Sequence, residues 1–278
     1  MDLNWLQSVI FGCISGLMDI LPVSAQAHRL LLLKFFGVSN VSPLMMLAVH
    51  LGISAALYSV CRGQLVRMNR AKQLSRVPKN KRKRPLDVKS LMDRSMLITM
   101  LIPVILGFWF HSYSRNLEKR MFLVALFLLI NGIVLYAPQF FPTGNRDSRT
   151  LSRIEGLLMG LGGGASLLPG ISAMGAMFSV GSVCGIDRNY RLDMALLVNL
   201  FVNLGLAVMD ISAIANSGLK GLTLLILLRY ILTGVFSFGA AMVGIRALRQ
   251  ITENYCWSVF GLYCIGLSLF TFILNLMA

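Results

Sequence analysis

The sequence has little charge: Asp, Glu, Lys and Arg make up 13% of its 278 residues, whereas 56% are hydrophobic and the mean hydropathy is +0.72. A soluble domain of this length rarely has so few charged residues, so the composition indicates a membrane protein. The first residues contain no basic segment ahead of the apolar run and no small-residue cleavage pattern. A cleaved signal peptide is therefore not expected.

Cysteine spacings typical of metal sites are also absent. The five cysteines (Cys13, Cys61, Cys184, Cys256 and Cys264) are scattered through apolar segments and are predicted to be buried free thiols. Acidic residues are few, 11 against 26 Lys and Arg, which leaves a formal net charge of +15. Twelve basic residues lie in the 62–94 connection, which has no aromatic residues to stack on bases. We therefore expect no nucleic-acid partner and interpret this connection as a cytoplasmic loop facing anionic lipid.

Six apolar runs are long enough, or nearly so, to cross about 30 Å of hydrocarbon as helices. They lie near residues 43–61, 95–110, 121–137, 193–214, 222–245 and 256–277. Two further segments, 5–36 and 152–185, are apolar but broken by Pro, Gly and Ser. Non-helical backbone at membrane depth is tolerated only where protein or a water-filled cavity surrounds it. We therefore predict that both segments form re-entrant helix–turn–helix hairpins.

The predicted fold is an all-α polytopic membrane protein of six transmembrane helices and two re-entrant hairpins. Residues 1–140 would form one repeat, with the hairpin 5–36 and three spans, and residues 150–278 a second, with the hairpin 152–185 and three spans. An odd number of spans per half inverts the second repeat relative to the first. Interrupted segments at corresponding positions of inverted halves point to a binding site near the membrane midplane.

The basic residues predict the orientation of the spans. Placing 62–94 in the cytoplasm also places 138–153, 185–192 and 246–255 there, and these four stretches hold nineteen Lys and Arg. The external connections hold four: Arg115, Lys119, Arg120 and Lys220. Because cytoplasmic loops carry an excess of Lys and Arg, we expect both termini to lie outside.

The two interruptions share a sequence skeleton, LPVSA at residues 21–25 and LPGISA at residues 168–173. Ser24 and Ser172 stand where helix N-caps are expected. Two helix N-termini that meet near the membrane centre would offer free N–H groups to an anion, and Gly170 and Gly175 would let the backbone approach it closely. A structural alternative exists, because the Gly12-x-x-x-Gly16 pattern is also typical of helix packing in membranes.

Ionisable residues in apolar segments are costly and usually face a cavity. Asp19 is the carboxylate of the first hairpin, and His28 and Arg29 follow the turn as its expected partners, with Arg29 also a candidate phosphate ligand. His50 is equally consistent with a packing role and with a place in the binding site. A further two residues, Asp210 and Arg229, are interpreted first as a structural pair and second as a lipid headgroup contact.

These motifs resemble those of the undecaprenyl-pyrophosphate phosphatase, or bacitracin-resistance, family over nearly the whole chain. The family's first motif is approximately EGxTEFLPxSSSGH, and residues 15–28 read SGLMDILPVSAQAH. Its second is approximately QxxALxPGxSRSG, and residues 163–175 read GGASLLPGISAMG. The words VHLG at 49–52 and GIDR at 185–188, with Asp193, resemble two further family patterns.

The resemblance implies a hydrolase of the bacterial plasma membrane that removes the terminal phosphate of undecaprenyl pyrophosphate on the outer side. The product would be the recycled lipid carrier for peptidoglycan and other cell-wall glycans. It also implies Mg²⁺ or another divalent cation, held by Asp19. His28 would supply acid–base chemistry, and Ser24 or Ser172 would lie near the phosphate.

The chain departs from the family where the chemistry is carried. Ser15 and Asp19 stand at two family Glu positions, Ala25 at a Ser, Ala173 at an Arg and Gly163 at a Gln. Fewer side chains are therefore available to neutralise the negative charge of the phosphoryl group during its transfer. One arginine in such a position can lower the activation barrier by several kcal/mol. Two functions stay open: a diphosphatase, and a protein that binds polyprenyl phosphate or moves it across the membrane. A purely structural subunit would leave the paired hairpins unexplained, and a homodimer is left open.

The predicted orientation can be tested by cysteine labelling in intact cells. A cysteine placed in the 62–94 connection by Asn80→Cys should not react with a membrane-impermeant thiol reagent added outside, because that connection is expected in the cytoplasm. Efficient labelling from outside would overturn the topology.

Overall fold

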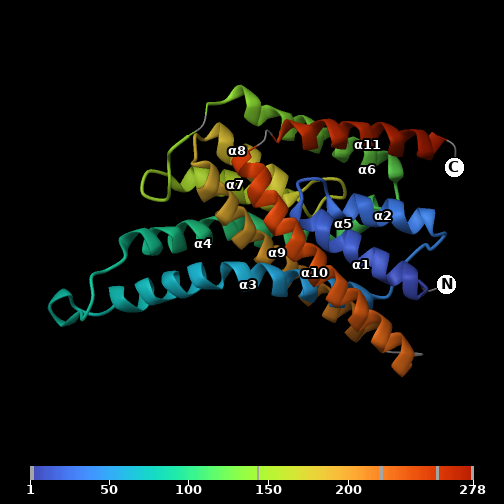
Figure 1. Ribbon diagram of the computed structural model, residues 1–278, viewed down its shortest axis with the longest axis horizontal. Helices are drawn as coiled ribbons and strands as arrows, with labels where there is room; N and C mark the ends of the chain where they lie inside the picture. The colour runs from blue at the N-terminus through green and yellow to red at the C-terminus, as the bar shows by residue number, and fades with distance from the viewer. Residues whose placement is uncertain (1–2, 143, 219–221, 255–256, 277–278) are drawn as a thin grey trace.

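The computed structural model describes residues 3–142, 144–218, 222–254 and 257–276 and shows a helical protein (Figure 1). In the first part of the chain the elements are α1 (Trp5–Ile20), α2 (Ala25–Phe35), α3 (Pro43–Ser75), η1 (Lys79–Lys81), α4 (Val88–Trp109), α5 (His111–Leu117), α6 (Met121–Tyr136) and η2 (Ala137–Phe140). In the second they are α7 (Arg153–Ala165), α8 (Ala173–Val183), α9 (Arg188–Ser217), α10 (Leu224–Asn254) and α11 (Ser258–Leu276). The described cysteines are free, as predicted; Cys61 and Cys264 are buried as well, whereas Cys13 and Cys184 are only half-buried. Cys256, like Lys220, lies outside the described residues.

Six helical segments are long and apolar enough to cross a membrane, which confirms the predicted number of spans: α3, α4, α6 continued by η2 to Phe140, α9, α10 and α11. The largest difference is at α3, which continues to Ser75 instead of ending near residue 61. Residues 62–75 are mostly good helix formers and precede the helix-breaking Pro78. The 33 residues of α3 span about 50 Å, well over the roughly 30 Å of hydrocarbon, so part of the basic segment is helix.

Both interrupted segments form two helices joined by a turn, as predicted. Residues 21–24 separate α1 from α2, and residues 166–172 separate α7 from α8. The longest of these four helices, α1, has 16 residues and a length of about 24 Å, which is too short to cross the hydrocarbon. That the hairpins enter and leave the same face of a bilayer stays a prediction.

Glycines allow α1 and α7 to lie directly against long helices. A Cβ atom added at Gly12 would lie 2.4 Å from the carbonyl oxygen of Thr233 on α10, and one at Gly16 would lie 2.1 Å from that of Ser237. On α7, a Cβ at Gly160 would lie 2.2 Å from the carbonyl oxygen of Met100 on α4. The packing interpretation of the Gly12-x-x-x-Gly16 pattern is therefore confirmed.

The two parts of the chain pack across each other. Helix α1 lies on α10, and α7 lies on α4; α3 packs against α9, and α6 packs against α11 (Figure 1). These four pairs map onto one another if α1, α3, α4 and α6 are matched in order with α7, α9, α10 and α11, whereas the packing of α3 on α10 has only a small counterpart between α9 and α4. The site residues described below therefore come from both parts.

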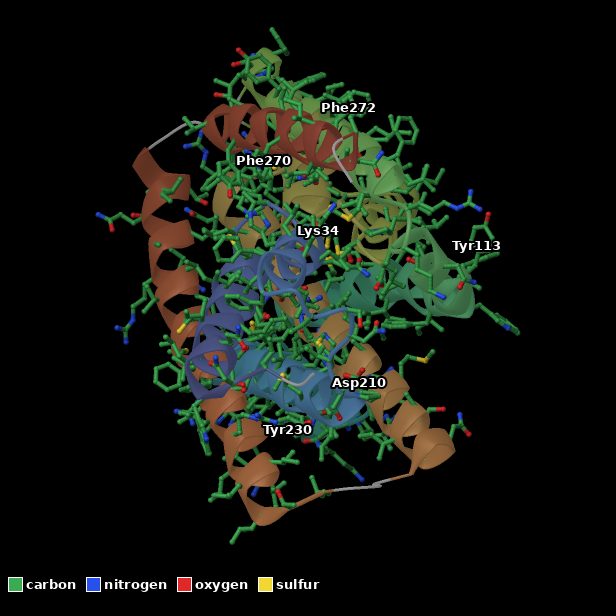
Figure 2. All side chains as sticks on the ribbon, turned by 90° about the vertical axis from the view of Figure 1, so that its right-hand side faces the viewer. Lys34, Tyr113, Asp210, Tyr230, Phe270 and Phe272 are labelled. Atoms are coloured by element: carbon green, nitrogen blue, oxygen red, sulfur yellow. The ribbon has the colours of Figure 1, made fainter. Side chains whose placement is uncertain are left out.

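Large apolar side chains cover the outside of this bundle. Phe270 and Phe272 on α11 are 54% and 39% exposed, and Figure 2 shows this helix along one edge of the molecule. Tyr113 is 67% exposed and lies at another edge of the same view. An apolar outer surface together with six spans identifies a multi-pass membrane protein.

The close contact between α1 and α10 predicts the effect of adding a methyl group. Gly16→Ala should force the two helices apart and cost about 1–3 kcal/mol, which lowers the melting temperature of the detergent-solubilised protein by several degrees. Gly239→Ala is the matched control, because it makes the same substitution on α10 where no atom lies within 4 Å. Equal melting temperatures for the two variants would contradict the packing account.

Candidate functional site

The turns of the two hairpins meet at Asn131 of α6. The Asn131 side-chain amide donates to the carbonyl oxygen of Pro22 at 3.3 Å, and its side-chain oxygen accepts the backbone N–H of Ser172 at 3.0 Å. The Ser172 hydroxyl also donates to the carbonyl oxygen of Leu21 at 3.5 Å. Asn131 is 1% exposed, so these bonds form inside the protein and satisfy one backbone group of each turn.

Serine caps the returning helix of each hairpin, as predicted. The Ser24 hydroxyl oxygen accepts the backbone N–H of Ala27 at 3.5 Å, and that of Ser172 accepts the N–H of Gly175 at 3.2 Å. Ser24 has φ +64°, a conformation that costs an L residue energy and that surrounding contacts must maintain. The two caps therefore set where α2 and α8 begin beside the junction.

A cavity of about 200 Å³ opens beside this junction. Its lining includes three of the predicted site residues, Asp19, Arg29 and Ser172. The main polar side chains around them are Gln26 of α2, His50 of α3, Glu118 after α5, Ser166 in the second turn, and Asn199 and Asp210 of α9. Both hairpins thus contribute to a single cavity.

Two carboxamides of α9 hold the Asp19 side chain. Asn199 and Asn203 each donate a side-chain N–H to Asp19 Oδ2 at 2.9 Å. Because the two residues are four positions apart on one helix, both amides reach the same carboxylate. The two amides therefore hold the Asp19 carboxylate in place at the cavity wall.

Arg29, His50 and Asp210 form a chain along the cavity. His50 Nδ1 lies 2.7 Å from Asp210 Oδ2, and His50 Nε2 lies 3.5 Å from a guanidinium nitrogen of Arg29. Figure 2 labels Asp210 on α9. The Arg29 charge also interacts with Asp19 and Glu118, and Glu118 in turn accepts a hydrogen bond from Gln26.

Four predicted site residues, Ser24, His28, Gly170 and Gly175, are outside the lining of this cavity. The ring of His28 bonds the Ser24 carbonyl oxygen and the Tyr263 hydroxyl, both at 2.8 Å, and stacks on Tyr263. A Cβ at Gly170 would meet the α6 backbone at 2.8 Å, and one at Gly175 would meet Leu135 at 3.0 Å. These glycines allow close helix packing, and their predicted contact with phosphate stays a prediction.

The comparison with known proteins identifies the family of this chain. Residues 8–270 match the model of the family described as bacitracin resistance protein BacA. The chain belongs to the BacA family. It is 28% identical over 273 residues to an undecaprenyl-diphosphatase of Methanobrevibacter smithii, with 93% of each chain covered. It is 25% identical over 275 residues to undecaprenyl-diphosphatase 1 of Shouchella clausii, with 98% of this chain and 96% of the relative covered.

The substituted motif positions lie in or near the cavity. Ala25 and Ala173 line it, each in the first turn of a returning helix. Ser15 is fully buried one turn before Asp19, and its hydroxyl has no hydrogen-bond partner among the described residues. This BacA-family chain therefore has small side chains at two positions of the cavity wall.

The metal prediction can be compared with the available ligands. The described residues contain no group of three His, Cys, Asp or Glu side chains placed to hold a metal ion by themselves. Mg²⁺ at phosphate sites commonly takes only one or two carboxylates, together with phosphate oxygens and water. Asp19 fits this role, because both of its amide donors use Oδ2 and leave Oδ1 for another partner.

Several site residues were not singled out from the sequence. Asn199 and Asn203 had a usable signal, because two carboxamides four residues apart in an apolar span share one helix face. Asn131 is one polar residue in an apolar run, which by itself does not identify a partner. The interpretation of Asp210 as a partner of Arg229 needs correction, since the side chain that Asp210 contacts in the cavity is His50.

The bridging role of Asn131 predicts a large effect of its removal. Asn131→Leu leaves the Pro22 carbonyl and the Ser172 N–H buried without their partner, at a cost of about 1–3 kcal/mol for each. We expect a lower melting temperature of the detergent-solubilised protein. Asn216→Leu, at an exposed position of α9, is the matched control and should leave the melting temperature unchanged. An Asn131→Leu protein with unchanged stability would show that the bridge is dispensable.

Proposed function

We propose that the cavity binds the headgroup of undecaprenyl pyrophosphate and that the protein hydrolyses its terminal phosphate. The observation that carries this proposal is the junction at Asn131, which brings the turns of both family motifs to one cavity containing Asp19 and Arg29. Membership of the BacA family and the undecaprenyl-diphosphatase names of its relatives support the substrate class.

The cavity residues suit separate parts of this reaction. Arg29 would pair with phosphate oxygens, and the Ser172 hydroxyl lies in the cavity beside the N-terminus of α8, where N–H groups favour an anion. Asp19 would hold a divalent cation, which would withdraw charge from the phosphate during attack by water. His28 would act in acid–base chemistry only after leaving Tyr263. Ser172 already lines the cavity, and its hydroxyl would donate to phosphate in place of the Leu21 carbonyl oxygen.

The membrane arrangement belongs to the same proposal. The two hairpins would be re-entrant, the parts 1–140 and 150–278 would be inverted repeats, and the 62–94 connection would lie in the cytoplasm of a plasma-membrane protein. The packing of α1 on α10 and of α7 on α4, in which the first hairpin helix of each part contacts a long helix of the other part, supports the repeats. The nineteen basic residues of the four assigned stretches support the orientation.

A specific observation favours a second function, binding or transport of the lipid without hydrolysis. Ala25 and Ala173 line the cavity where the family motifs have Ser and Arg. A site without those groups can still hold an anionic headgroup through Arg29 and backbone N–H groups. It offers less stabilisation to a transferring phosphoryl.

Phosphate release by the purified protein tests the proposal. The wild type should release phosphate from undecaprenyl pyrophosphate in Mg²⁺ and lose this activity in a chelator. Asp19→Asn should lower release by about a hundredfold or more while sparing lipid binding, since it removes the metal ligand but not the anion-binding groups. The control is Asp193→Asn, which should keep activity because Asp193 lies near the N-terminal end of α9 and is not among the residues that line the cavity.

The outcomes separate the two functions. No release by the wild type, with lipid binding retained, would exclude the enzyme and leave the binding protein. Mg²⁺-dependent release that survives Asp19→Asn would refute the metal site.

A further inference from the structure

The cavity holds more negative than positive charge. Among the described residues that line it, three are carboxylates, Asp19, Glu118 and Asp210, whereas Arg29 is the side chain with a permanent positive charge. A pyrophosphate brings further negative charge into this space. If the cavity binds such a headgroup, as proposed above, positive charge from a divalent cation or from a proton must accompany it, and His50 is the lining imidazole that can take up a proton.

The contacts of His50 define its state in the structure. A guanidinium donates hydrogen bonds and accepts none, so a hydrogen bond between Arg29 and His50 Nε2, which lie 3.5 Å apart, requires that this nitrogen carries no proton. The proton of the neutral ring is then on Nδ1, where it is donated to Asp210 at 2.7 Å. With its side chain 4% exposed, the neutral imidazole connects Arg29 to Asp210 inside the protein.

Protonation of His50 changes only one of its two contacts, the contact with Arg29. The imidazolium keeps its Nδ1 bond to Asp210, and that bond becomes an ion pair. At Nε2, a new N–H faces the N–H groups of Arg29, so the contact becomes repulsive. Arg29 can then turn from His50 to an anion in the cavity that both side chains line.

We infer that headgroup binding is coupled to the uptake of one proton by His50, and that His50 and Asp210 position Arg29 for the anion. The charged groups around this chain are Arg29 on α2 and Asp210 on α9, with Asp19 on α1 and Glu118 after α5 also on the cavity wall. Helix α10 packs on α3 at the Gly52–Gly234 crossing, and its nearest ionisable residues in sequence are Tyr230 and Arg229. On α3 itself the nearest is Tyr58, two turns further along.

The direction of the pH effect follows from charge. An anion beside His50 stabilises the imidazolium, so the bound state holds the proton more tightly than the free state. Affinity should therefore rise as the pH falls, by up to about tenfold per pH unit while one proton is taken up. The ligand also titrates near pH ~6, but that contribution is common to all variants.

Binding of farnesyl pyrophosphate to the purified full-length protein, in detergent with a chelator to prevent hydrolysis, tests the coupling between about pH 8 and pH 6. The key variant is His50→Gln, whose carboxamide can accept from Arg29 and donate to Asp210 but does not titrate. At the higher pH this variant should bind like the wild type. Between the higher and the lower pH its affinity should increase at least fivefold less than that of the wild type. His50→Ala should bind more weakly even at the higher pH.

Arg29→Gln should weaken binding at least tenfold at both pH values, whereas Arg249→Gln, in an exposed ion pair with Asp193, should match the wild type. Equal pH dependence in the wild type and His50→Gln would overturn the coupling and leave the proposed function intact. Unchanged binding by Arg29→Gln would overturn the positioning role. No binding by the wild type at any pH would refute the proposed function itself.

Discussion

Two helices that stop inside an apolar protein leave backbone N–H and C=O groups without helical partners, and the carboxamide of Asn131 supplies a partner to each turn. A carboxamide can donate and accept at once, whereas a carboxylate accepts only and an ammonium donates only. In surroundings without water, each unsatisfied backbone group costs several kcal/mol. The two hairpins are thus joined by this buried side chain, together with the direct bond from the Ser172 hydroxyl to the Leu21 carbonyl oxygen.

The cavity that results is polar on several sides and is built from many helices. Its charged groups come from α1, α2 and α9 and from the connection after α5, and its histidine comes from α3. Asp19 is fixed by two carboxamides of α9, and Arg29 is held through His50 by a carboxylate of the same helix. Helix α9 therefore orients the polar groups of the first hairpin, although it belongs to the other part of the chain.

The motif substitutions have a consistent physical meaning in this setting. Ala25 and Ala173 make the walls beside the two turns small and uncharged. The positive charge of the site comes instead from Arg29, whose surroundings are mainly acidic. A BacA-family scaffold is thus combined with a cavity whose lining includes three carboxylates and one guanidinium.

Much of the fold was predictable because it follows from local physics. Apolar runs predicted the six spans, since transferring residues 121–137 or 222–245 into lipid depends on their own composition. Proline, glycine and serine predicted the breaks at residues 21–24 and 166–172, because their backbone preferences act within a few residues. The end of α3 was misplaced, since hydropathy reports where lipid ends and not where a helix of polar residues ends.

The sequence by itself determined the class of protein, its helices, the two caps and the presence of Asp19 and Arg29 near a turn. The tertiary structure decided which polar groups meet: Asn131 with both turns, Asn199 and Asn203 with Asp19, His50 with Asp210, and His28 with Tyr263 instead of the cavity. The physical reason is the separation along the chain between the groups that interact. Helix formation and capping depend on hydrogen bonds between near neighbours, whereas a contact such as Asn203 with Asp19 depends on the packing of helices far apart in the chain.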